Sequence, residues 1–136
     1  MARMRLVVLV ALALVLDAPA SAAIVTAKLT TSTTRPIAGE PWRYTVNVRS
    51  GGKPIAARMR LQVVRGGAVV GCWKRGRIVR CTGSSAGDWI AFRGMRTGRI
   101  RWAVASVGTR LTFQAIVRAR HETLRLSAPV TVRRAP

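Results

Sequence analysis

The chain has 136 residues, of which 24 are Lys or Arg and only four are Asp or Glu, so its formal net charge is +20. Four carboxylates and one histidine leave few groups for acid–base catalysis or for holding a metal ion, which argues against an enzyme. A charge this one-sided attracts polyanions, and salt weakens the attraction. The composition therefore favours a binding or structural role.

The first 22 residues have the features of a secretory signal peptide. Arg3 and Arg5 precede an apolar run over residues 6–16, and Ala20-Ser21-Ala22 is a small-residue cleavage site. The run is about half of the roughly 20 residues that cross a bilayer, so no membrane span is expected after processing. We expect a helical signal peptide at 1–22 and one domain at 23–136, in the cell envelope or outside the cell.

Short alternations of apolar and polar residues, separated by Gly, Pro and Ser, follow the signal, which is typical of a β-sandwich or barrel. A strand is expected over residues 24–32, then a turn-rich connection over 35–41. In the next strand, the side chains at 42, 44, 46 and 48 share an apolar face. Residues 58–63 form a further strand, and Gly66-Gly67 turns the chain into residues 68–74.

The second half begins with the least regular stretch, residues 82–98, which is expected to be mostly loop. Residues 99–104 then alternate again, and the clearest alternation covers residues 111–120. A turn near 120–123 returns the chain through a last strand that ends near Val132. About eight strands in a chain of this length suit two antiparallel sheets packed face to face.

The order of turns and strands also carries a family resemblance. The pieces that match are Ala38-Gly39-Glu40 before Tyr44, Gly52-Lys53-Pro54, Val69-Val70-Gly71, Gly108 before Leu111, and Pro129-Val130-Thr131-Val132. In this order the chain resembles secreted bacterial immunoglobulin-like domains. The resemblance implies an all-β, two-sheet antiparallel immunoglobulin-like sandwich of about seven to nine strands. Such modules serve as spacers, adhesins and binding domains. The chain departs from antibody domains in one respect, because its two cysteines are too close in sequence to form the usual disulfide between the two sheets.

Cys72 and Cys81 flank a predicted β-hairpin. If Gly76-Arg77 is its two-residue turn, Trp73 faces Arg80 and Cys72 faces Cys81 at a non-hydrogen-bonded pair about 4.5 Å apart. We therefore predict a cross-strand disulfide that stabilises the fold by about 2 to 3 kcal/mol. The alternative is a metal or redox pair, but zinc needs four ligands, C-x-x-C spacing is absent, and export favours oxidation.

Pairs of arginines recur on the predicted outer faces of strands, two residues apart in three cases and six apart in the first. Each pair forms a short basic row, and rows on neighbouring strands could merge into one surface. The pairs are Arg43 and Arg49, Arg58 and Arg60, Arg99 and Arg101, and Arg118 and Arg120. Guanidinium groups bind phosphate and carboxylate in bidentate fashion. The other interpretation is that these arginines only keep the surface soluble and oppose aggregation.

Aromatic side chains help to choose a candidate binding surface. Trp42, Tyr44, Trp102 and Phe113 fall on predicted inner faces, which leaves Trp73 and Trp89 for the surface. Trp73 would make a cation–π contact with Arg80. The candidate binding surface consists of Trp73, Arg75, Arg77, Arg80, Trp89, Arg93 and Arg96.

The sequence predicts no catalytic residues, no metal site and no cofactor. A Ser-His-Asp arrangement would have to use His121, which lies in a predicted turn, and no phosphate-binding glycine motif is present. The leading hypothesis is a secreted, non-catalytic module with a binding or structural role, its partner an acidic polymer or another extracellular protein. The alternative is a cationic protein that binds cell-envelope polymer or extracellular DNA, without sequence-specific recognition of nucleic acid. A small hydrolase or metal-binding protein is a third, weaker possibility.

Overall fold

The computed structural model describes residues 24–83 and 87–136, so the predicted signal peptide lies outside the described residues. The described residues form ten strands and one 3₁₀ turn, η1 (Val104–Ser106). The strands are β1 (Val25–Thr31), β2 (Pro41–Ser50), β3 (Lys53–Pro54), β4 (Ala56–Arg65), β5 (Ala68–Lys74), β6 (Arg77–Arg80), β7 (Trp89–Arg93), β8 (Met95–Arg101), β9 (Arg110–Ala119) and β10 (Glu122–Thr131). The number of strands exceeds the expected seven to nine by one, and the additional count includes β3, which has only two residues.

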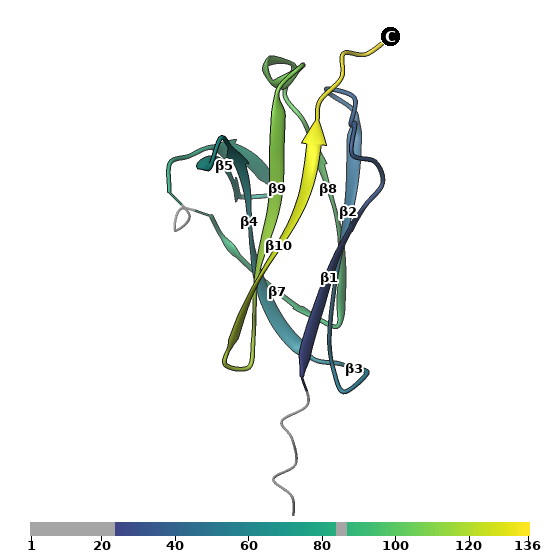
Figure 1. The fold of residues 1–136 in the computed structure, drawn as a ribbon, viewed down its shortest axis with the longest axis vertical. Coiled ribbons are helices and arrows are strands. Elements are labelled where there is room, and N and C mark those ends of the chain that lie inside the picture. The colour runs from purple at the N-terminus through teal and green to yellow at the C-terminus, as the bar shows by residue number, and fades with distance from the viewer. Residues whose placement is uncertain (1–23, 84–86) are drawn as a thin grey trace, which may run out of the picture.

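Two antiparallel sheets pack face to face, as the alternating pattern predicted (Figure 1). The four-stranded sheet has the order β1-β2-β3, with β8 also paired to β2. The six-stranded sheet has the order β10-β9-β4-β5-β6, with β7 also paired to β4. At one side of the sandwich, β1 of the first sheet runs beside β10 of the second.

The core lies between the sheets and is built from the alternating apolar positions of β2, β4 and β9. Trp42, Tyr44 and Phe113 are each at most 1% exposed. The Trp42 and Phe113 rings meet edge to face with centroids 5.0 Å apart, and Trp102 lies 5.3 Å from Trp42. The prediction that these four aromatic residues belong to the core is confirmed.

Residues 82–98 are more regular than the sequence predicted, because they contain β7 and most of β8. On β7, Ile90 and Phe92 pack on the core, while Trp89 and Ala91 pair with Arg60 and Arg58 of β4. Since β7 carries apolar side chains on both faces, it shows no apolar–polar alternation, and the loop prediction was wrong for this segment. At Gly94 the chain crosses from the six-stranded sheet to the four-stranded one.

The β5–β6 hairpin has a different register from the predicted one. Trp73 pairs with Ile78 and Lys74 with Arg77, so the turn consists of Arg75 and Gly76. Both turn residues have positive φ, 50° and 86°, as a type I′ turn requires. The predicted Gly76-Arg77 turn and the pairing of Trp73 with Arg80 were therefore wrong.

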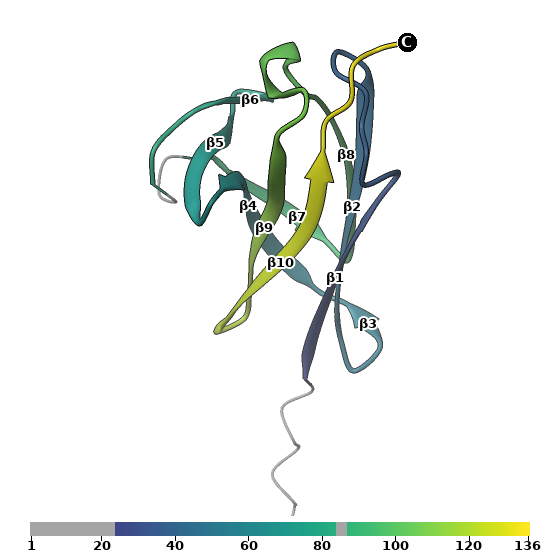
Figure 2. The ribbon, with the colours of Figure 1, turned by 45° about the horizontal axis from the view of Figure 1, so that its top comes forward.

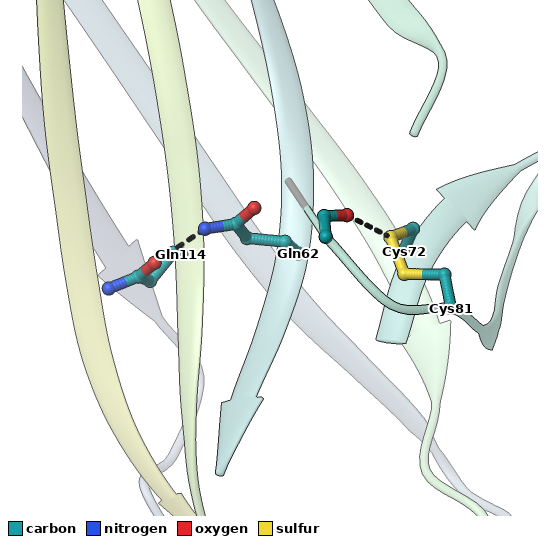
Figure 3. Close-up of a disulfide and its surroundings, with 5 residues drawn as sticks. Gln62, Cys72, Cys81 and Gln114 are labelled. Atoms are coloured by element: carbon teal, nitrogen blue, oxygen red, sulfur yellow. Dashed lines mark hydrogen bonds between the residues drawn. A yellow bond between two sulfur atoms is a disulfide. The ribbon is translucent and has the colours of Figure 1, made fainter. Parts of the chain in front are cut away.

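The Cys72–Cys81 disulfide is confirmed, although it joins residues that are not opposite each other (Figure 3). Cys72 pairs with Val79, and Cys81 lies two residues further along the chain. The two Cα atoms are 5.8 Å apart, which a disulfide spans readily. The Cys81 N–H donates to the carbonyl of Val70, so the chain remains beside β5 after β6 has ended.

Candidate functional site

The structure distributes the residues of the predicted binding surface over three places. Trp73, Arg75, Arg77 and Arg80 belong to the β5–β6 hairpin, Trp89 and Arg93 to β7, and Arg96 to β8 in the other sheet. The five arginines are exposed and Trp89 is half-buried. Trp73 is also half-buried, but it packs against the core and therefore contributes to the fold.

Trp89 is surrounded by arginines that the predicted surface did not include. The guanidinium carbon of Arg60 lies 4.2 Å from the centroid of the Trp89 ring, that of Arg118 4.9 Å and that of Arg58 5.0 Å. We call these four residues the arginine–tryptophan cluster. Each distance is within the range of about 6 Å in which an aromatic ring attracts a cation.

Strand β4 assembles the cluster because it has partners on both edges. Along one edge, Arg60 pairs with Trp89 of β7. Along the other edge, Arg58 pairs with Arg118 of β9. Since paired residues of antiparallel strands project to the same face, all four side chains reach the outer face of the six-stranded sheet.

Next to the cluster, the same face carries a hydrogen-bonded polar row. The Gln62 side-chain amide donates to Oε1 of Gln114 at 2.7 Å (Figure 3). The Gln114 amide donates to the Ser127 hydroxyl at 3.2 Å. Gln62 is 2% exposed and pairs with Cys72 of β5. This row ties β4, β9 and β10 together and holds the backbone that presents the arginines.

The charge of the cluster is not balanced by acidic side chains at Arg58 and Arg118, which form no ion pair within the described part of the chain. Cross-strand like charges repel each other. The electron-rich face of Trp89 offsets part of that repulsion. An arriving anion would relieve the rest, because guanidinium groups bind carboxylate and phosphate in charge-assisted hydrogen bonds.

An open hollow of about 580 Å³ adjoins the cluster. Arg58, Arg118 and Arg120 line it together with the small side chains of Ala56 and Ala91. His121 and Glu122, at the β9–β10 turn, complete the far side. The hollow gives an anionic group a place to contact several arginines at once.

The opposite face of the sandwich carries a smaller basic pair. Arg43 of β2 and Arg99 of β8 are direct cross-strand partners on the four-stranded sheet, and both are exposed. Among the described residues, no aromatic ring lies within cation–π distance of this pair. The two faces therefore allow a comparison between arginines that contact an aromatic ring and arginines that do not.

The sequence contained part of the signal for the cluster. The alternating pattern places the rows Arg58–Arg60 and Arg118–Arg120 on outward faces, and the structure brings Arg58 beside Arg118. The pattern did not show that β7 pairs with β4, and this pairing places Trp89 at the centre of the cluster.

Among the described residues, no group of three His, Cys, Asp or Glu side chains comes together in a way that could hold a metal ion. No helix in the described ranges is long and apolar enough to cross a membrane.

Comparisons with known proteins identify no family for this chain. No protein-family model matches it, and no curated protein matches its sequence. Among solved structures, it is similar to Spo0M, a sporulation control protein from Bacillus subtilis, with a TM-score of 0.42 and 10% sequence identity. The alignment covers 80% of this chain and 49% of Spo0M, so the chain spans about half the length of that protein.

Proposed function

We propose that this protein is a secreted, non-catalytic β-sandwich module of the immunoglobulin-like type that binds a phosphate- or carboxylate-bearing polymer through the arginine–tryptophan cluster. The observation that carries the proposal is the gathering of three guanidinium groups around Trp89, with no carboxylate paired to Arg58 or Arg118 in the described chain. The signal-peptide pattern predicted at residues 1–22 and the disulfide support a location outside the cytoplasm.

The geometry favours binding of a polymer backbone over base recognition. Three arginines lie around the face of Trp89, so the ring serves to position cations and is not open for stacking on a base. Guanidinium groups on a twisted sheet instead suit a chain of repeated anionic groups. Arg93 and Arg125, both exposed, would extend the contact along the same face.

The test compares two double substitutions that remove the same charge. Arg58→Gln with Arg118→Gln alters the cluster, while Arg43→Gln with Arg99→Gln alters the cross-strand pair on the opposite face. Binding of labelled heparin and of a labelled single-stranded oligonucleotide is measured from low to physiological salt. We expect the cluster variant to lose about tenfold or more in affinity, with a shallower dependence on salt, since two anion contacts are lost.

The control variant should lose much less affinity. Equal losses in the two variants would mean that the net charge of the whole molecule attracts the polymer and that the cluster has no special role. Absence of binding at every salt concentration would contradict the proposal and leave the module with a structural role.

A further inference from the structure

A second hollow, separate from the arginine–tryptophan cluster, lies between the β5–β6 hairpin and the β8–β9 connection. Both segments lie at the upper end of the sandwich in Figure 2. The hollow has a volume of about 520 Å³. This is within the range of roughly 300 to 1,000 Å³ that is typical of small-molecule sites.

The wall of this groove is mainly apolar and reaches into the core. Val63, Trp102 and Leu111 line it and are at most 8% exposed. Val69 and Ile78 line it from the hairpin side. Gly71 makes room between them, because a Cβ at this position would come within 3.1 Å of the Ile78 side chain.

Among the described residues, three arginines and no carboxylate line the same groove. Arg65 and Arg80 are exposed, while Arg101 donates a hydrogen bond to the carbonyl of Gly39 at 2.6 Å. The groove therefore combines an apolar wall with a positively charged margin. An apolar ligand with an acidic end group would complement both parts, since a guanidinium group binds a carboxylate in bidentate fashion.

Trp102 supplies a second observation at the same place. Its indole Nε1 is buried and has no hydrogen-bond acceptor within the described part of the chain, whereas Nε1 of Trp42 donates to the carbonyl of Thr33 at 2.7 Å. An alkyl chain would leave this N–H unpaired, so the indole serves here as part of the apolar wall and as a reporter of its occupation.

We propose that this groove binds a single-chain amphiphilic anion, such as a free fatty acid, with its alkyl chain against Val63, Trp102 and Leu111 and its carboxylate at Arg65 and Arg80. The disulfide supports the site, because Cys81 and Thr82 form part of the wall beside β6. This inference does not rest on the proposed polymer binding, since the two sites use different arginines.

Calorimetric titration with dodecanoate, below the concentration at which it self-associates, tests the inference. Dodecanol has the chain without the charge, and butanoate has the charge with little chain. We expect dodecanoate to bind about tenfold or more tightly than either, because only dodecanoate matches both parts of the groove. Its binding should also shift the indole N–H resonance that Trp102→Phe removes.

Two neighbouring residues of η1 provide matched variants. Ala105 lines the groove, whereas Val104 is 72% exposed and does not. Ala105→Trp should reduce dodecanoate binding about tenfold or more by filling the groove, and Val104→Trp should leave it unchanged. Arg65→Gln with Arg80→Gln should lower the affinity for dodecanoate to that for dodecanol.

Several results would overturn the inference. These are no binding of dodecanoate, equal binding of dodecanol, or equal effects of the two η1 variants. Binding only to vesicles of anionic phospholipid, lost in Ala105→Trp, would replace the free ligand by a bilayer surface. Arg58→Gln with Arg118→Gln should leave dodecanoate binding intact, so failure here and failure of polymer binding can be told apart.

Discussion

Arg58 of β4 and Arg118 of β9 are direct cross-strand partners, and both guanidinium carbons lie within 5.0 Å of the centroid of the same Trp89 ring. Two like charges at paired positions of a sheet would ordinarily destabilise it. The aromatic face changes this balance by attracting both cations. Trp89 is therefore a stabilising partner for the arginines as well as the centre of the proposed binding surface.

Replacing Trp89 should consequently lower stability. Trp89→Leu keeps an apolar side chain but removes the cation–π contacts, so we expect a loss of about 1 to 2 kcal/mol in the free energy of unfolding. Urea denaturation measures this loss. Trp89→Phe, which keeps an aromatic ring, should lose less. Equal stability of the Leu variant and the wild type would mean that the arginines gain nothing from the ring.

Removal of the disulfide should also destabilise the fold. Cys72→Ala with Cys81→Ala frees a loop of about ten residues in the unfolded chain, which costs roughly 2 to 3 kcal/mol. The unfolding free energies of the native protein and the double variant give the difference. Intact mass after alkylation without reductant tests the bridge itself, and incorporation of two alkyl groups by native protein would contradict it.

The observed turn of the β5–β6 hairpin predicts a stabilising substitution. Arg75 has a φ of 50°, which asparagine tolerates better, and Asn-Gly is the preferred pair for a type I′ turn. The Arg75 backbone N–H, which donates to Asp88 at 2.9 Å, is retained in any variant other than proline. Arg75→Asn should therefore raise the unfolding free energy by about 0.5 kcal/mol.

Gly76 is the control position for this turn, because its φ of 86° disfavours any side chain. Gly76→Ala should lower thermal stability where Arg75→Asn raises it. Under the register predicted from the sequence, Arg75 would lie in a strand and Arg75→Asn would destabilise, so the sign of the change distinguishes the two registers.

Tyr44 should make the fold sensitive to alkaline pH. Burial raises the pKa of Tyr44, and the nearby guanidinium of Arg96 only partly opposes this shift. Because the folded pKa lies above the usual value of about 10, the unfolded chain ionises first. The contribution of the buried, neutral Tyr44 to the free energy of unfolding is therefore fully present below about pH 10. It is lost as the pH rises through the pKa of Tyr44 in the folded protein.

Tyr44 is the only tyrosine of the chain, so tyrosinate absorbance reports on it alone. Tyr44→Phe should make stability less dependent on pH above about 10. Arg96→Gln should raise the pKa of Tyr44 further. An unchanged pKa in that variant would show that Arg96 has no influence on the hydroxyl.

The sequence predicted the strands that bury one face in the core and expose the other face to solvent. On β2 and β9, an inward-facing Tyr44 or Phe113 alternates with polar residues, and this period of two identifies both the strand and its core face. Where Trp89 lies on the outer face and Ile90 packs inward, the period disappears. The strand was missed for that reason.

The binding site was harder to predict than the strands. Periodicity shows to which face Arg58 or Trp89 projects, but it does not show which strands are neighbours. The cluster depends on β4 pairing with β7 and β9, contacts between segments that are far apart in sequence. The predicted hairpin turn lay one residue too far along the chain, which shifted each cross-strand partner by two residues. A turn could be built with Gly76 in either central position, and only the positive φ of Arg75 decides between them.

Strand β4 links these features in a further respect. It is bonded to β9 on one edge and to β7 and then β5 on the other, whereas β6 pairs only with β5 within the described chain. The backbone amides of β4 should therefore exchange with solvent only when the whole domain unfolds, while those of β6 exchange through local opening. The side of the groove formed by β6 should therefore open locally more readily than the strand that carries Arg58 and Arg60.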